Sequence, residues 1–176
     1  GGDITTSVSG QSVGIFAQSG QGNAVAINVS GSISASSYDG YAVGLVARAD
    51  EGFSSIANFG GGSITAYSAY GYAIGMLGTG DGVGASNIGT IEASGYYLAA
   101  GIVAHSTNYT SVSTSDGSIS AIAVGAAYGI DAQSVYGNVR VNSSNSIEAV
   151  GIVLGARGIQ ATSEYGYVAL GNSGDI

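Results

Sequence analysis

The chain of 176 residues contains no cysteine, proline, tryptophan or lysine. Without cysteine it forms no disulfide bond and offers no thiolate to a metal ion. Without proline every residue keeps a backbone N–H, which suits a chain of hydrogen-bonded strands. Three arginines against 11 acidic residues give a net charge of −8, so the chain has too few cations to bind nucleic-acid phosphates or an anionic membrane surface. No run of about 18 apolar residues is present, so we expect no membrane insertion.

One short pattern recurs along the sequence: a small polar residue, an isoleucine and, two residues later, a small residue. Successive isoleucines of this pattern are 27 to 31 residues apart. They are Ile4, Ile33, Ile64, Ile91, Ile119, Ile147 and Ile176. A period in this range is typical of architectures in which similar units stack on one another. Because the sequence starts and stops at the same phase, we expect residues 1–176 to be a single segment of a longer repetitive protein.

A glycine follows each of the first six isoleucines by 10 or 11 residues, and an aliphatic residue follows the glycine. The aliphatic residues are Ile15, Leu45, Met76, Ile102, Ile130 and Ile159. The next position varies freely, and a small residue comes after it, which is the alternation of a strand with one buried face. This alternation changes phase at the glycine, which indicates a bend or bulge with no room for a Cβ atom.

A third, less regular side of the repeat closes with asparagine in most units (Asn28, Asn58, Asn87, Asn142 and Asn172). We therefore predict an all-β protein, a parallel β-helix or β-solenoid of about six coils of ~29 residues, with three short strands per coil. Equivalent strands of successive coils would pair in parallel about 4.8 Å apart. The predicted core has two aliphatic columns: Ile33, Ile64, Ile91, Ile119 and Ile147 in one, and Leu45, Met76, Ile102, Ile130 and Ile159 in the other.

The sequence offers little for catalysis. His105, the only histidine, is expected on the outer face with Asp131 near it, but an exposed face supplies neither a buried base nor an oxyanion hole. Glu92 and Glu148 share an outward column about 9.6 Å apart, a separation near that of an inverting glycosidase, yet no third acid or base accompanies them. We predict no catalytic residue, no cofactor and no metal site, and keep a carbohydrate-active enzyme as a less favoured alternative.

Tyrosine is the unusual side chain, with 12 residues against three phenylalanines. Six tyrosines cluster around the predicted corner between the first two sides of the coil: Tyr38, Tyr41, Tyr70, Tyr72, Tyr96 and Tyr97. They can form a stacked ladder that stiffens the corner. They can also form a lateral strip that binds a glycan or a protein, because tyrosine offers both a ring face and a hydroxyl. Both interpretations are open at this point.

Units such as Gly62-Ser63-Ile64-Thr65-Ala66, followed by Tyr72-Ala73-Ile74-Gly75-Met76, resemble the degenerate repeats of bacterial autotransporter passenger domains and of related β-helical adhesins and haemagglutinins. The resemblance extends over all 176 residues as a pattern. It implies a right-handed β-helix, exposed at or released from the outer membrane of a Gram-negative bacterium. It also implies attachment or aggregation, with surface glycans or proteins of a host or bacterium as partners.

We accordingly predict a non-enzymatic extracellular stalk or adhesin segment. The alternative is a self-assembling filament, because open strand edges at the coil ends can pair with another copy. The predicted register also has a consequence for mutation. Ile102→Asp should be more damaging than Val103→Asp, because adjacent residues of a strand point to opposite faces.

Overall fold

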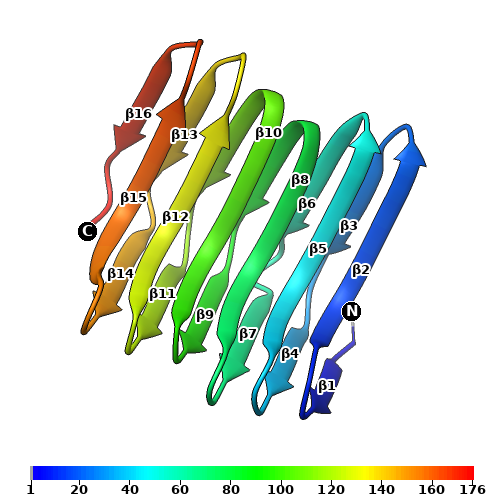
Figure 1. The fold of residues 1–176 in the computed structure, drawn as a ribbon, viewed down its shortest axis with the longest axis vertical. Coiled ribbons are helices and arrows are strands. Elements are labelled where there is room, and N and C mark those ends of the chain that lie inside the picture. The colour runs from blue at the N-terminus through cyan, green and yellow to red at the C-terminus, as the bar shows by residue number, and fades with distance from the viewer. Residues whose placement is uncertain (1) are drawn as a thin grey trace.

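A computed structural model describes residues 2–176 and shows a β-solenoid (Figure 1). Its sixteen elements are all strands, and residues 2–176 contain no helix. Each coil rises along the front, turns over at the top and descends behind, while the chain advances from the N-terminal edge to the C-terminal edge (Figure 1). This winding is right-handed, which is the hand that parallel crossover connections prefer.

The first side of the coils forms a six-stranded parallel sheet in the order β1-β4-β7-β9-β11-β14. Its strands are β1 (Ile4–Val8), β4 (Ser32–Ser37), β7 (Ser63–Ser68), β9 (Thr90–Gly95), β11 (Ser118–Ala123) and β14 (Ser146–Gly151). The repeat isoleucines pair with one another in this sheet, for example Ile33 with Ile64 and Ile91 with Ile119. The repeat period of the sequence is therefore the length of one coil.

The second and third sides together form a ten-stranded parallel sheet. The second side contains β2 (Ser12–Gln21), β5 (Tyr41–Glu51), β8 (Tyr72–Asn87), β10 (Leu98–Thr114), β12 (Ala126–Ser134) and β15 (Gly155–Ser163). The third side contains β3 (Ala24–Asn28), β6 (Phe53–Asn58), β13 (Val139–Ser143) and β16 (Val168–Asn172). The strands β3 and β6 pair with each other, β6 also pairs with β8, and β13 pairs with β10 and β16.

The prediction of three strands in every coil is wrong for the third and fourth coils. There β8 and β10 continue around the corner and supply both the second and the third side. In the first two coils the corner contains Gly22 and Gly52 at φ of 104° and 133°, a left-handed backbone that interrupts the strand. The corners of β8 and β10 have no residue in that region, but neither do those of the fifth and sixth coils, where the strands break between Ser134 and Val139 and between Ser163 and Val168. A register shift between Ser106 and Tyr109 accompanies the turn in the continuous strands.

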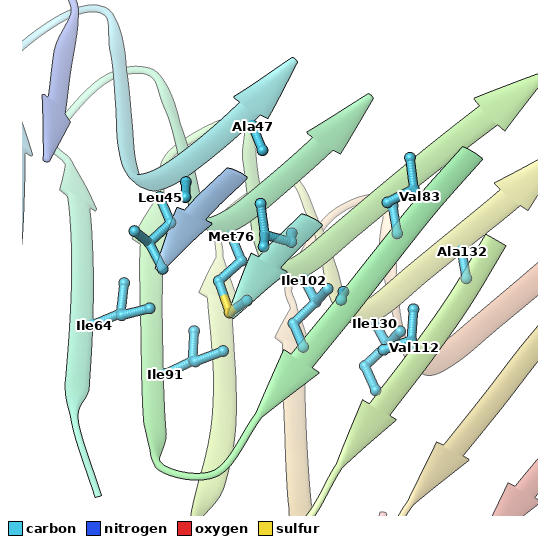
Figure 2. Packing of buried hydrophobic residues seen from close by; sticks show 14 of the residues in the cluster. Leu45, Ala47, Ile64, Met76, Val83, Ile91, Ile102, Val112, Ile130 and Ala132 are labelled. Carbon is cyan, nitrogen blue, oxygen red and sulfur yellow. The ribbon is translucent and has the colours of Figure 1, made fainter. Parts of the chain in front are cut away.

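The core is a set of stacked columns of aliphatic side chains, as Figure 2 shows for Ile64, Ile91, Leu45, Met76 and Ile102. Nine of the ten predicted core residues are buried: Ile33, Ile64, Ile91, Ile119, Ile147, Leu45, Met76, Ile102 and Ile130. The tenth, Ile159, is only partly buried. It lies in β15, at the end of the strand order, so no further coil within residues 2–176 covers it.

The third side adds inward columns that the sequence did not reveal. Ile56, Val83, Val112 and Val139 are fully buried and belong to the same core cluster as the two predicted columns. Thr110, also fully buried, stands between Val83 and Val139 in the register. Polar and small residues alternate with aliphatic ones down these columns, which hid their periodicity.

The glycine after each repeat isoleucine lies where no side chain fits. A Cβ atom built on Gly101 would collide with Cγ2 of Ile119 in the next coil and would stand 2.6 Å from the carbonyl oxygen of Gly129. The ladder pairs the residues before and after this position but skips the glycine itself. The predicted irregularity with no room for a Cβ atom is confirmed, because the isoleucine of the following coil fills the space over the glycine.

Asparagine side chains form a short ladder inside the third corner. The Asn28 amide donates to Asn58 at 2.9 Å, and the Asn58 amide donates to Asn87 at 2.9 Å. The next rungs are hydroxyls, with Thr114 donating to Ser143 at 2.8 Å. Asn142, which the sequence suggested for this column, is exposed and pairs with Ser113, one residue before Thr114. The amide ladder is therefore shorter than the spacing of the asparagines in the sequence implied.

Val103 faces outward, as predicted. It belongs to neither cluster of buried hydrophobic residues, whereas its neighbour Ile102 belongs to the aliphatic core. It is nevertheless only 7% exposed, since Leu77 and Asp131 flank it in the register. A charge at Val103 would therefore be partly desolvated and would lie next to Asp131. The pair Ile102→Asp and Val103→Asp is a poorer test of the register than the sequence suggested.

Candidate functional site

The six clustered tyrosines lie at the turns that join the first side of a coil to the second. We call this group, Tyr38, Tyr41, Tyr70, Tyr72, Tyr96 and Tyr97, the tyrosine corner. Hydrogen bonds between coils hold the turns in register: the Tyr70 N–H donates to the Tyr38 carbonyl at 2.9 Å, and the Tyr96 and Tyr97 N–H groups both donate to the Gly71 carbonyl at 3.0 Å. The turns of three successive coils therefore present their rings at the same edge.

The rings form two columns that meet. In one column the ring centroids of Tyr38 and Tyr70 are 5.2 Å apart, and those of Tyr70 and Tyr96 are 6.1 Å apart. In the other, Tyr41 stacks on Tyr72 at 4.8 Å, and Tyr72 lies 5.8 Å from Tyr97. An edge-on contact of 5.2 Å between Tyr96 and Tyr97 joins the columns, so the six rings form one array.

The array is stacked and exposed at the same time. The exposed fraction of its residues ranges from 37% for Tyr72 to 61% for Tyr38. Ring pairs of this kind stabilise a fold by about 0.5–1.5 kcal/mol each beyond the area that they bury. The corner therefore gains stiffness from its own contacts while ring faces and hydroxyls stay open to a partner.

The predicted contact between His105 and Asp131 is confirmed. His105 Nε2 lies 2.9 Å from Asp131 Oδ2, and the side-chain amides of Gln133 and Gln160 donate to Asp131 at 3.0 and 3.3 Å. Burial raises the pKa of Asp131, but the hydrogen bonds from His105, Gln133 and Gln160 and the charge of His105 outweigh it and hold the pKa below its ordinary value of 3.8. Within residues 2–176 no serine hydroxyl hydrogen-bonds to His105, whose side chain pairs with Asp131.

The lowered pKa makes Asp131 a source of stability at neutral pH. A carboxyl group whose pKa is lower in the folded state stabilises the fold above its unfolded pKa, and that contribution is lost as the pH falls through the folded value. We expect Asp131→Asn to lower the free energy of unfolding at pH 7 by about 1–2 kcal/mol and to differ less from wild type as the pH falls below 3.8. Urea denaturation across this range measures the difference.

Asp50→Asn is the control, because Asp50 pairs with Arg48 at 2.9 Å on an exposed surface and such pairs contribute about 0–1 kcal/mol. A constant difference between Asp131→Asn and wild type at all pH values would show that the Asp131 charge is not involved.

Glu92 and Glu148 lie on the outer face of the first-side sheet, in register with Ser120 between them. Ser120 Oγ donates to Glu148 at 3.4 Å. The three arginines are on other strands, in β5, β13 and β15, so neither glutamate has a cationic partner in its sheet. Among residues 2–176 no group of three or more histidine and acidic side chains is arranged to hold a metal ion.

A hollow of about 380 Å³ opens beside Glu92, with Thr65, Tyr67, Ser94, Ser120 and Ile122 around it. Tyr67, Ser94 and Ile122 were not among the residues predicted to form a site. Each follows its repeat isoleucine by three residues. A comparison of this outward position in successive repeats would therefore have placed them in one column. The hollow arises because this column alternates large, small and large.

Comparisons of the chain with protein-family models, with curated proteins and with solved structures found no match. Residues 2–176 include no helix long and apolar enough to cross a membrane. The resemblance to autotransporter passengers and adhesins therefore stays a prediction from the sequence.

Proposed function

We propose that this chain is a non-enzymatic segment of an extracellular attachment protein and that it binds glycans laterally through the tyrosine corner. The observation that carries the proposal is the continuous array of six exposed rings. A pyranose has an apolar face of C–H groups that packs on an aromatic ring, and the tyrosine hydroxyl can hydrogen-bond to the sugar hydroxyls around it. The solenoid holds the rings in fixed positions, so little conformational entropy is lost on binding.

Charge narrows the ligand class. A net charge of −8 repels glycans that carry carboxylate or sulfate groups. We therefore infer that the partners are predominantly neutral glycans on a cell surface. A stalk that spaces such a site from the secreting cell, or presents it to a neighbouring cell, fits attachment or aggregation.

The test is a variant that combines Tyr41→Ala, Tyr72→Ala and Tyr97→Ala, which removes one column of rings. On an array of neutral oligosaccharides we expect at least a tenfold loss of apparent affinity, because each lost ring contact is worth about 0.5–1.5 kcal/mol. The control combines Tyr136→Ala and Tyr165→Ala, which removes a stacked pair with centroids 5.6 Å apart outside the corner. We expect this control to bind as the wild type does.

Two results would refute the proposal: a wild-type protein that binds no glycan on the array, or a corner variant that binds as well as wild type does while remaining folded. Sedimentation of the same samples addresses the alternative of a filament. A protein that stays monomeric at high concentration would count against self-assembly.

A further inference from the structure

The hollow on the outer face of β7, β9 and β11 has the form of a slot. Tyr67 pairs with Ser94, and Ser94 pairs with Ile122, so the three side chains follow one another in a single outward column. Tyr67 is 49% exposed and Ile122 is 44% exposed. The small Ser94 between them forms the floor, and the hollow of about 380 Å³ lies within the range of about 300–1,000 Å³ typical of small-molecule sites.

The coil spacing sets the width of the slot. Paired strands lie about 4.8 Å apart, so Tyr67 and Ile122 are separated by about 9.6 Å. One ring placed over Ser94 would lie about 4.8 Å from each wall, which is the spacing at which side chains stack elsewhere in the column. The slot therefore has room for one ring in the position that a large side chain occupies in the neighbouring coils.

The groups beside the slot are hydrogen-bonding groups. Glu92 precedes Ser94 by two residues on the same outward face, and Thr65 and Ser120 flank Glu92 in the register. The Glu92 carboxylate hydrogen-bonds to no side chain within residues 2–176, in contrast to Glu148, which accepts from Ser120. A carboxylate can accept two hydrogen bonds from adjacent hydroxyls, while the serine and threonine hydroxyls can donate or accept.

We propose that this slot binds a single uncharged pyranose, stacked on Tyr67, with two of its hydroxyls donating to Glu92. An aliphatic or aromatic ligand without hydroxyls would leave the carboxylate desolvated and unpaired, which is costly, and an anionic sugar would be repelled by it. Tyr70 and Tyr96 follow Tyr67 and Ser94 by three and two residues, so a longer glycan could continue from the slot onto the tyrosine corner. The inference rests on the proposed function, because it names one subsite for the same class of ligand.

The experiment is a titration of the ¹⁵N-labelled chain with methyl β-D-glucopyranoside and methyl β-D-galactopyranoside. We expect at least one of them to shift the amide signals of Ser94 and Tyr67 with a Kd of about 1 mM or weaker, as befits so small a ligand. Ser94→Tyr fills the slot and should weaken binding at least tenfold. Glu92→Gln should weaken it about three- to tenfold, and a methyl glucuronide, which carries a carboxylate, should bind several times more weakly than the neutral sugars.

Ser7→Tyr is the matched control, because Ser7 lies in the same outward column, one coil beyond Ser36, which is the neighbour of Tyr67. It adds the same side chain outside the slot and should leave the affinity unchanged. The slot is refuted if neither sugar shifts these signals at tens of millimolar, or if Ser94→Tyr binds as the wild type does while its spectrum shows an intact fold.

The corner variant with three tyrosines replaced separates the two proposals. If it retains methyl pyranoside binding while it loses oligosaccharide binding, the slot is a subsite of its own. If it loses the methyl pyranoside as well, the sugar binds at the corner and the slot is wrong. If the slot binds no sugar, the proposal that the tyrosine corner binds glycans still stands, since the oligosaccharide array tests it separately.

Discussion

Replacing Ile119 by asparagine is expected to unfold the protein or to lower its free energy of unfolding by about 4 kcal/mol or more. Ile119 is fully buried in the aliphatic core. Loss of a buried aliphatic side chain costs about 2–5 kcal/mol, and a buried amide without partners adds about 1–3 kcal/mol. Ile91 and Ile147 pair with Ile119 in the coils on either side of it, so the substitution disturbs the core of three coils.

Ile122→Asn is a matched control in the same strand, β11. Ile122 faces outward and is 44% exposed, so we expect the change to alter the free energy of unfolding by less than about 1 kcal/mol. Urea denaturation of both variants, followed by circular dichroism, provides the measurement. Equal losses of stability would mean that the two isoleucines do not lie on opposite faces, and the assigned register would be wrong.

Gly101→Ala is expected to destabilise the protein by about 3 kcal/mol, although it adds only one methyl group. That methyl group would meet Ile119 Cγ2 and the backbone oxygen of Gly129. Neither can move away freely, because the isoleucine is packed in the core and the oxygen belongs to the backbone of the next coil. Overpacking of a tight core costs about 1–3 kcal/mol, and occasionally more.

Gly20→Ala separates this effect from the general cost of changing glycine. Gly20 is an exposed residue of β2, and a Cβ atom built on it meets nothing within 4 Å. We expect this variant to match the wild type or to gain about 0.4–1 kcal/mol, because alanine restricts the unfolded chain. Thermal melts of both variants measure the contrast, and an unperturbed Gly101→Ala protein would show that successive coils are not in close contact at this column.

The parallel solenoid could be predicted from the sequence because each coil buries the same positions of the repeat. The repeat isoleucine and the residue after the anchor glycine recur in every unit, so their stacking follows from the period alone. The clustering of the six tyrosines was predictable for the same reason, since they share a phase of the repeat. The contact of Tyr96 with Tyr97, which joins the two columns into one array, could not be predicted from the sequence.

The features that the sequence did not predict depend on differences between coils. The strands β8 and β10 run through the corner at which the strands of the other four coils break, and the partial exposure of Ile159 comes from its place in the edge strand β15. The slot over Ser94 exists because one column changes from tyrosine to serine to isoleucine. A search for residues that repeat from coil to coil does not detect a site that depends on differences between coils.

A disulfide cross-link tests the stacking of coils most directly, since the chain has no cysteine of its own. Ser34 and Thr65 are paired in adjacent coils, about 4.8 Å apart, which is within the Cα separation of about 4.4–6.8 Å that a disulfide requires. Glu92 lies one coil further along the same column, about 9.6 Å from Ser34. On mild oxidation of the dilute protein, Ser34→Cys with Thr65→Cys should form an intramolecular disulfide, and Ser34→Cys with Glu92→Cys should keep two free thiols. Free thiols in the first variant, or a cross-link in the second, would contradict the parallel, in-register solenoid.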